Sequence, residues 1–280
     1  MTLVWFDGAL HDEHAPLVTA LDHGLTVGDG VFETLLVRRG QAFALTRHLA
    51  RLARSAAGLG LAAPDEDRVR AGVRDVLAAA GPEIARLRIT VTAGPGPLGS
   101  GRDGLEQSVL VAAGPALLGR SSRAVRVGWV RNERSPVAGL KTTSYAENVV
   151  ALAAAHEYGA DEALLANTRG ELCEGTGSNV VVERDGALLT PPLESGCLAG
   201  ITRELLLEWG VDEGLPVREE TLGFDVLDDV VQGRAHAALT SSTRNVSPLA
   251  ALDGQEIAAG ELCLAAQAMF ERRMDDDLDP

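Results

Sequence analysis

Cysteine is scarce in this sequence, and its scarcity argues against a disulfide framework and against a structural zinc site. The three cysteines, Cys173, Cys197 and Cys263, lie far apart, with no C-x-x-C spacing and no cluster of histidines beside them. A disulfide framework needs paired cysteines, and a structural zinc site needs closely spaced ligands. We therefore expect free thiols and no metal.

Long hydrophobic runs and positive charge are also missing. No window approaches the roughly eighteen uncharged apolar residues of a membrane-spanning helix. The formal net charge of −15 repels phosphate backbones, which argues against a general role in nucleic-acid binding. The first residues, "MTLVWFDGAL", lack the basic region and cleavage site of a secretory signal. We expect a cytoplasmic protein that acts on small molecules.

The apolar segments that are present predict a mixed fold of two domains, 1–119 and 120–280. A chain of 280 residues exceeds the usual size of one core. Strand-like segments such as "VFETLLV" alternate with amphipathic helical ones, which places the fold in the α+β or α/β class. Asp7-Gly8 and Arg39-Gly40 are expected to form turns between the first strands. In the first helix, Thr46 is the expected N-cap, and Gly58 and Gly60 are expected to end it. The acidic "MDDDLDP" tail is expected to be frayed.

The second domain has its own local signals. Ser144 and Glu147 match the S-x-x-E capping box of a helix that ends at Gly159. Another helix is expected to begin at Ile201, where its unpaired amides could hold an anion. "GPGPLG", residues 94–99, matches G-x-G-x-x-G but is followed by a further strand, so we interpret it as a β-hairpin loop and reject a dinucleotide site.

Lys141 and Glu174 are the residues whose surroundings indicate chemistry. A lysine ahead of a helix is most often a solvated surface charge. In "GLKTTSY", however, Lys141 is set among small and polar residues, as a lysine that must attack in its neutral form requires. Glu174, in "LCEGTGSN", could hold a pyridine nitrogen in its protonated, electron-withdrawing form.

Several motifs in order resemble the class IV aminotransferases, the fold-type IV pyridoxal phosphate enzymes. The resemblance covers nearly the whole chain and rests on "DHGLTVGDGVFET", "HLARL", "GLKTTSYAENV", "ADEALLANTRGELCEGTGSNVVV", "LAGITRELL" and "TSSTRNVSPL". It implies a two-domain enzyme that binds pyridoxal 5'-phosphate in the cleft between a small N-terminal domain and a larger domain carrying the catalytic lysine. The family's active sites also imply a homodimer.

The resemblance also implies a role for individual residues. Lys141 resembles the catalytic lysine that forms the aldimine, and Glu174 resembles the partner of the pyridine nitrogen. The remaining cofactor-binding candidates are Arg51 and the amides of Ile201 and Thr202 for the phosphate, Ser242 or Thr243 as its hydroxyl ligand, Tyr145 near the ring oxygen, and Asn179 on the adjoining loop.

The substrate pocket departs from the patterns of the known subgroups. Leu98 and Ser100 occupy the places where D-amino-acid transaminases carry the Arg and His that bind the substrate carboxylate. Phe32 replaces a tyrosine of those enzymes and makes the pocket wall more apolar. Arg244 is then a candidate carboxylate ligand, although a surface or interface arginine would give the same pattern.

We expect a transaminase that moves an amino group from a D-amino acid or (R)-amine to a keto acid. One alternative is an aminodeoxychorismate lyase, which eliminates pyruvate and gives p-aminobenzoate, and a second is a branched-chain amino acid aminotransferase. A non-catalytic relative that binds the cofactor or a partner is a further alternative, which the joint presence of Lys141, Glu174 and Arg51 opposes.

Overall fold

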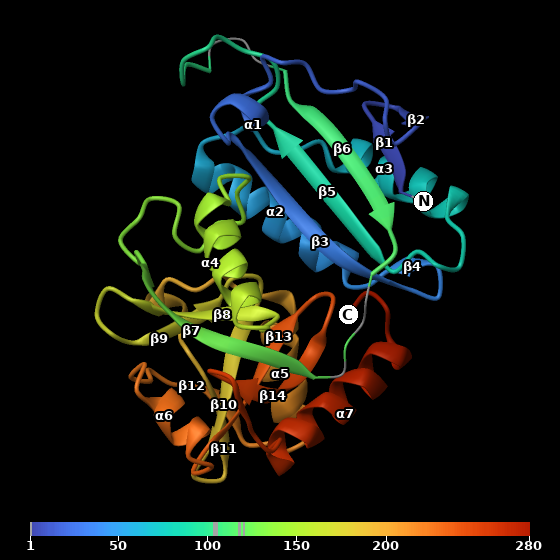
Figure 1. Cartoon of the computed structure of the whole chain (residues 1–280). Helices are drawn as coiled ribbons and strands as arrows, with labels where there is room; N and C mark the ends of the chain where they lie inside the picture. Colours follow the sequence, from blue (N-terminus) through green and yellow to red (C-terminus); the bar gives the residue numbers. More distant parts are fainter. Residues whose placement is uncertain (1, 103–105, 117–118, 120) are drawn as a thin grey trace. The chain divides into compact units, whose positions relative to one another are not determined.

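The computed structural model describes residues 2–102, 106–116, 119 and 121–280, which form two mixed α/β units (Figure 1). The first unit contains the described part of 1–117 together with Leu140–Tyr145 and Asp277–Pro280. The second contains the described part of 118–139 together with Ala146–Asp276. Lys141 therefore groups with the first unit by its backbone contacts, while the predicted division at 119/120 stays a prediction.

The first unit is built on one antiparallel sheet of six strands in the order β2-β1-β6-β5-β3-β4. Its strands are β1 (Leu3–Phe6), β2 (Ala9–His11), β3 (Gly30–Arg38), β4 (Gln41–Ala42), β5 (Arg86–Thr92) and β6 (Ser108–Gly114). Asp7 and Gly8, and likewise Arg39 and Gly40, have positive φ angles and form the tight turns that the sequence predicts. The 94–99 segment lies in the connection between antiparallel β5 and β6, which confirms its interpretation as a hairpin loop.

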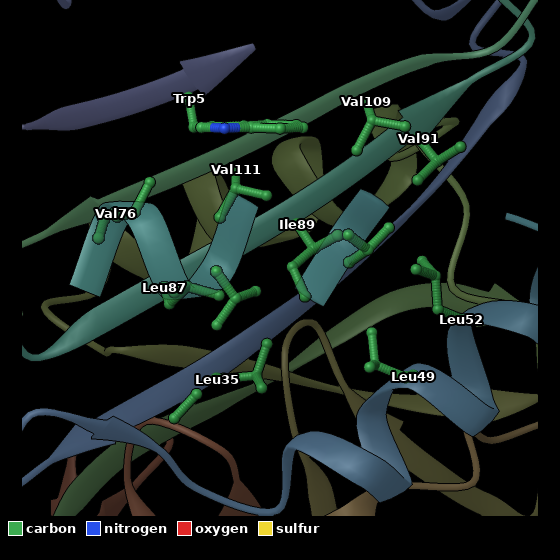
Figure 2. Close-up of a cluster of buried hydrophobic side chains, with 14 of the residues drawn as sticks. Trp5, Leu35, Leu49, Leu52, Val76, Leu87, Ile89, Val91, Val109 and Val111 are labelled. Carbon is green, nitrogen blue, oxygen red and sulfur yellow. The ribbon is translucent and has the colours of Figure 1, made fainter. Parts of the chain in front are cut away.

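Two helices, α2 (Leu45–Leu59) and α3 (Glu66–Ala79), cover one face of this sheet, and the short α1 (His23–Thr26) precedes β3. Side chains alternate along each strand, so Leu87, Ile89 and Val91 of β5 all enter the core under the helices (Figure 2). Trp5 and Leu52 are nearly fully buried in the same cluster. The intervening residues of β5 face away from this core.

The start of α2 differs from the prediction. Ala44, with φ 54°, is the N-cap residue and provides no side-chain bond. Thr46 lies inside the helix, where its amide and hydroxyl donate to the carboxylate of Asp279 at 2.8 and 2.7 Å. The predicted Thr46 cap is therefore wrong, and so is the frayed tail, because the tail carboxylate binds an amide that the helix start leaves unpaired. Gly60, with φ 76°, ends the helix as predicted, whereas Gly58 lies inside it and does not.

The second unit is built on a nine-stranded mixed sheet in the order β12-β11-β10-β13-β14-β7-β8-β9, with β15 paired to β14. Its strands are β7 (Ser122–Arg131), β8 (Glu162–Asn167), β9 (Leu172–Gly175), β10 (Asn179–Arg184), β11 (Ala187–Thr190), β12 (Val217–Glu219), β13 (His236–Ser241), β14 (Asn245–Leu252) and β15 (Gln255–Glu256). Its helices are α4 (Ala146–Glu157), η1 (Leu193–Ser195), α5 (Ile201–Asp212), α6 (Val226–Val231) and α7 (Glu261–Asp276).

The predicted capping box of α4 is wrong. The helix begins at Ala146, two residues beyond Ser144, whose hydroxyl donates instead to the carbonyl of Gly28 at 3.0 Å. Glu147 pairs with Arg131 at 3.4 Å. Contacts distant in sequence have thus outcompeted the local motif. None of the helices in the described parts of the chain is long and apolar enough to cross a membrane.

The three cysteines are free and buried, as expected from their spacing. Burial, reinforced by the nearby carboxylate of Glu174, raises the pKa of the Cys197 thiol to about 11. The thiols are therefore protonated at neutral pH and are poor nucleophiles.

Candidate active site

Lys141 is placed by backbone bonds on both sides of it. Its carbonyl accepts the amide of Phe32 at 3.0 Å, and its own amide donates to Ser55 Oγ at 3.2 Å. Two residues on, the amide of Thr143 donates to the carbonyl of Gly30 at 2.8 Å. The lysine is therefore fixed against β3 and α2 and does not lie on a mobile surface loop.

The side chain of Lys141 lies against two aromatic rings. Its Nζ is 4.5 Å from the centroid of the Phe32 ring and 5.9 Å from that of Tyr145. The two rings pack edge to face, with centroids 5.3 Å apart and an interplanar angle of 85°. The structure thus brings together three of the predicted site residues in the first unit, and the lysine environment is aromatic where the sequence suggested small residues.

Lysine usage carries a further signal that motif reasoning passed over. Lys141 is the only lysine among the 25 basic Lys and Arg residues of the chain. Arginine serves every other position where a fixed positive charge is sufficient. Only lysine can lose its proton near neutral pH and attack a carbonyl carbon, so the single exception stands where that chemistry is expected.

Arg51 is buried on α2 and bonded to a carboxylate that the sequence analysis missed. Its Nε and Nη2 donate to the two oxygens of Glu33 at 2.8 and 2.6 Å, and His48 Nδ1 lies 2.6 Å from the same carboxylate. Burial raises the pKa of Glu33, but Arg51 and His48 outweigh it and hold this pKa at about 2. Arg51 as phosphate ligand stays a prediction, and Glu33 is what fixes its orientation.

A signal for Glu33 was present in the sequence. In "VFETLLV" the residues at positions 31, 35 and 37 point into the core, and position 33 belongs to the same alternating set. A carboxylate on a buried strand face requires a charged partner, and His48 and Arg51 occupy neighbouring positions on one face of α2.

Glu174 occupies β9 of the second unit and is nearly buried. One carboxylate oxygen accepts Arg131 Nε at 3.0 Å, and the other accepts the backbone amide of Leu198 at 2.8 Å. The arginine and the amide fix the direction of the carboxylate, and a carboxylate so placed can accept a hydrogen bond from a protonated pyridine nitrogen.

The start of α5 provides the features of an anion site. No side chain caps the helix at Gly200, and Ile201 and Thr202 are its first residues. A Cβ at Gly200 would come within 2.0 Å of Asn179 Oδ1, so the close approach of this loop to the helix start requires glycine. Asn179 Nδ2 in turn donates to the carbonyl of Leu198 at 2.8 Å. Asn179 thus stabilises the loop, and its role as a cofactor-binding residue stays a prediction.

Thr240 adds a hydroxyl that the sequence analysis missed. It pairs with Asn179 across β10 and β13, so both side chains share one face of the sheet. Its buried Oγ1 has no hydrogen-bond partner among the described residues. Uncapped helix amides and an unsatisfied buried hydroxyl on one side of the sheet suit a phosphate group. The donor set of this unit therefore fits the cofactor's anionic end.

The other predicted residues occupy less defined positions. Ser242 and Thr243 lie in the turn between β13 and β14. Leu98 and Ser100 are exposed in the β5–β6 connection of the first unit. Their roles stay predictions.

Arg244 already has a carboxylate partner. Its Nη2 donates to Glu162, which is buried and also accepts the amide of Gly177 at 2.9 Å and the hydroxyl of Ser178 at 3.1 Å. A substrate carboxylate would have to share this guanidinium with Glu162, so the role predicted for Arg244 requires a contact that the ion pair opposes.

Residues 30–252 match the family model of class IV aminotransferases. The chain is 31% identical to a putative branched-chain-amino-acid aminotransferase of Methanocaldococcus jannaschii over 91% of this chain and 89% of that protein. It is 34% identical to the bifunctional aminodeoxychorismate lyase / D-amino acid transaminase of Mycobacterium tuberculosis over 74% and 77% of the two chains.

Solved structures agree with the sequence relatives. A fold IV transaminase from Curtobacterium pusillum superposes with a TM-score of 0.82 at 30% identity, covering 98% of both chains. The pyridoxal phosphate-bound form of a hypothetical aminotransferase from Mycobacterium tuberculosis has a TM-score of 0.86 at 27% identity, covering 99% of this chain and 100% of that one. The chain belongs to the class IV aminotransferases, enzymes of fold type IV that use pyridoxal phosphate.

Proposed function

We propose that this class IV aminotransferase takes its amino group from D-amino acids and (R)-amines and passes it to a keto acid, with Lys141 as the catalytic residue. The observation that carries the proposal is the placement of Lys141. The only lysine of the chain is held at its backbone by β3 and α2, and its amine lies against the Phe32 and Tyr145 rings.

The cofactor, when bound, supplies the electron sink that stabilises negative charge on the substrate carbon. Glu174 would hold its ring nitrogen, and the start of α5 with Thr240 would hold its phosphate, with Arg51 as a further phosphate ligand. Lys141 would first bind the cofactor and then, once a substrate amine has replaced it, take up and return a proton at Nζ.

The names of the relatives support this substrate class without deciding it. The Mycobacterium tuberculosis relative is both an aminodeoxychorismate lyase and a D-amino acid transaminase, and the Methanocaldococcus jannaschii relative is a putative branched-chain enzyme. The apolar ring of Phe32 beside Lys141 favours substrates with a methyl or aryl group. Lyase and branched-chain activity are therefore the alternatives to test.

Single-turnover spectra of the holoenzyme test the substrate class. D-Alanine and (R)-1-phenylethylamine are expected to bleach the visible absorbance of the bound cofactor much faster than (S)-1-phenylethylamine or L-amino acids. Rapid bleaching by L-leucine would favour the branched-chain enzyme. Pyruvate release from aminodeoxychorismate, with no response to either amine, would establish the lyase.

Lys141→Ala tests the mechanism separately. Loss of the amine is expected to lower turnover on the order of 10⁴-fold or more, because one residue both attacks and transfers protons. Borohydride reduction of the parent holoenzyme is expected to add the cofactor's mass to the peptide that contains Lys141, the sole lysine. Normal turnover of Lys141→Ala would show that Lys141 is not the catalytic residue.

We further propose a cytoplasmic homodimer. Support comes from apolar side chains exposed on single elements, such as Val149, Val150 and Tyr158, which are 62%, 55% and 72% exposed on and just after α4. Exposed apolar side chains gathered on one helix are typical of a protein interface. Light scattering of the active enzyme at micromolar concentration is expected to give twice the mass of one chain, and an active monomer would contradict it.

A further inference from the structure

Arg88 stands on the face of the first-unit sheet that the helices do not cover. Its neighbours Leu87 and Ile89 point into the core, and the alternation of β5 turns Arg88 to the opposite side. Phe32 pairs with Thr90 across β3 and β5, two residues from Arg88, so Phe32 and Arg88 share that side. Arg88 is exposed in this position.

The guanidinium of Arg88 stacks on the same ring that contacts Lys141. Arg88 Cζ is 3.8 Å from the Phe32 centroid, and Lys141 Nζ is 4.5 Å from it. Tyr145 packs its ring against that of Phe32 and interacts electrostatically with Arg88. One ring therefore positions a fixed cation next to the catalytic amine, and all four residues belong to the first unit.

No carboxylate within the described ranges contacts Arg88, whose Nε donates only to Thr90 Oγ1 at 3.2 Å. Other arginines of the molecule have acidic partners: Arg51 pairs with Glu33, Arg131 with Glu174 and Arg244 with Glu162. Desolvation lowers the pKa of Arg88, partly opposed by Tyr145. A guanidinium stacked by its face keeps its N–H edge directed outward, where it can bind a carboxylate through two bonds.

We propose that Arg88 binds the carboxylate of the amino-acid and keto-acid substrates and thereby sets the preference for acids over simple amines. The inference rests on the proposed function. In this proposal Arg88 of β5 binds the substrate carboxylate, which the uncharged side chains of Leu98 and Ser100 cannot pair with. It takes the place of Arg244 as the predicted carboxylate ligand, because the guanidinium of Arg244 is bonded to Glu162.

Arg88→Leu tests the assignment through the ratio of two substrates. Losing a charge-assisted contact is expected to lower kcat/KM for D-alanine by roughly 10- to 100-fold relative to that for (R)-1-phenylethylamine, which has no carboxylate. Arg88→Lys is expected to recover part of the ratio. The matched control is Arg86→Leu, which removes an exposed arginine two residues away on the same face of β5 and is expected to keep the parent ratio.

A binding measurement gives a readout that does not depend on turnover. Calorimetric titration of the pyridoxal phosphate-loaded parent with propanoate is expected to show binding that Arg88→Leu weakens by at least 10-fold and Arg86→Leu does not. Propan-1-ol has the same carbon chain without the charge, so it is expected to bind the parent and the variants with similar affinity. Arg88→Gln repeats both measurements if the leucine variant lacks the parent's circular dichroism spectrum.

The outcomes separate this inference from the proposed function. If Arg88→Leu slows D-alanine and the amine equally, or leaves propanoate affinity at the parent value, the inference is wrong. If Arg244→Leu shows the selective loss and Arg88→Leu does not, Arg244 is the ligand. If the parent transfers no amino group yet Arg88→Leu loses propanoate binding, the proposed function fails while the carboxylate subsite stands.

Discussion

Two carboxylates of this protein, Glu33 in the first unit and Glu174 in the second, are each bonded to an arginine but differ in what else surrounds them. Glu33 is fully buried, and both its oxygens bond to charged or ionisable side chains, those of Arg51 and His48. Glu174 has one arginine, Arg131, and one backbone amide, that of Leu198. The first arrangement neutralises charge inside a core, and the second directs a carboxylate.

The difference teaches how to distinguish a structural carboxylate from a functional one. Removing the charge of Glu33 leaves a buried guanidinium without its counterion, so the cost falls on folding. Removing the charge of Glu174 leaves Arg131 near solvent-exposed Glu147, so the expected cost in stability is smaller, and under the proposed function the main effect is expected on the reaction rate. The predictions below test this division.

The largest effect on stability is expected from Glu33→Gln. The buried Arg51 charge loses its counterion, which is expected to lower the free energy of unfolding by about 3–5 kcal/mol. Denaturant unfolding measures it. The control is Glu66→Gln, which removes an exposed carboxylate paired with Arg70 and is expected to cost less than about 1 kcal/mol. Equal unfolding free energies of the two variants would show that the buried ion pairs of Glu33 stabilise the fold no more than an exposed ion pair does.

Glu174→Gln is expected to slow the single-turnover bleaching by D-alanine roughly 100-fold, since a neutral amide stabilises a protonated ring nitrogen less well. Its unfolding free energy is expected to change less than that of Glu33→Gln. A variant with parental rates and lowered stability would place Glu174 in the same structural class as Glu33.

Arg131→Gln is expected to have a smaller effect of the same kind. One charge-assisted bond to Glu174 is lost while the Leu198 amide remains, so single-turnover rates should fall about 10-fold. Arg131→Lys is expected to restore part of the rate. A fall as large as that of Glu174→Gln would show that the amide alone cannot hold the carboxylate in position.

The titration of Glu33 and His48 is expected to lower the stability of the folded protein gradually as the pH falls. This effect is expected to be smallest near neutral pH. Burial lowers the pKa of His48 from 6.5 despite Glu33, so protonation favours the unfolded chain as the pH falls below 6.5. The pKa of Glu33 is lowered from 4.5 to about 2, so its contribution is present above pH 4.5 and is lost as the pH falls toward 2.

Melting temperatures recorded from pH 7 to pH 2 test this sign. The parent is expected to lose stability with falling pH, and Glu33→Gln is expected to show a flatter profile between pH 4.5 and pH 2. Parallel profiles of parent and variant would mean that Glu33 titrates normally in the folded protein.

Local patterns predicted much of the fold because their causes are local. Gly60 ends α2, and Asp7-Gly8 and Arg39-Gly40 form turns, since these positions need left-handed backbone angles. The Thr46 cap and the Ser144 capping box failed because their donors bind partners far along the chain, Asp279 and Gly28. A local motif competes with every other partner in the folded protein, and the sequence shows only the local partners.

The sequence by itself determined the family and the order of the motifs, and it predicted which lysine is catalytic, because lysine is the residue type whose amine attacks a carbonyl. Only the tertiary structure decided which charges meet. Glu33 with Arg51, Glu162 with Arg244, and Arg88 with the ring of Phe32 are 18, 82 and 56 positions apart in the chain. Charge pairing depends on distance in space and on burial. For Glu33 and Arg88, the alternation of β3 and β5 sets both by turning successive residues to opposite faces of one sheet.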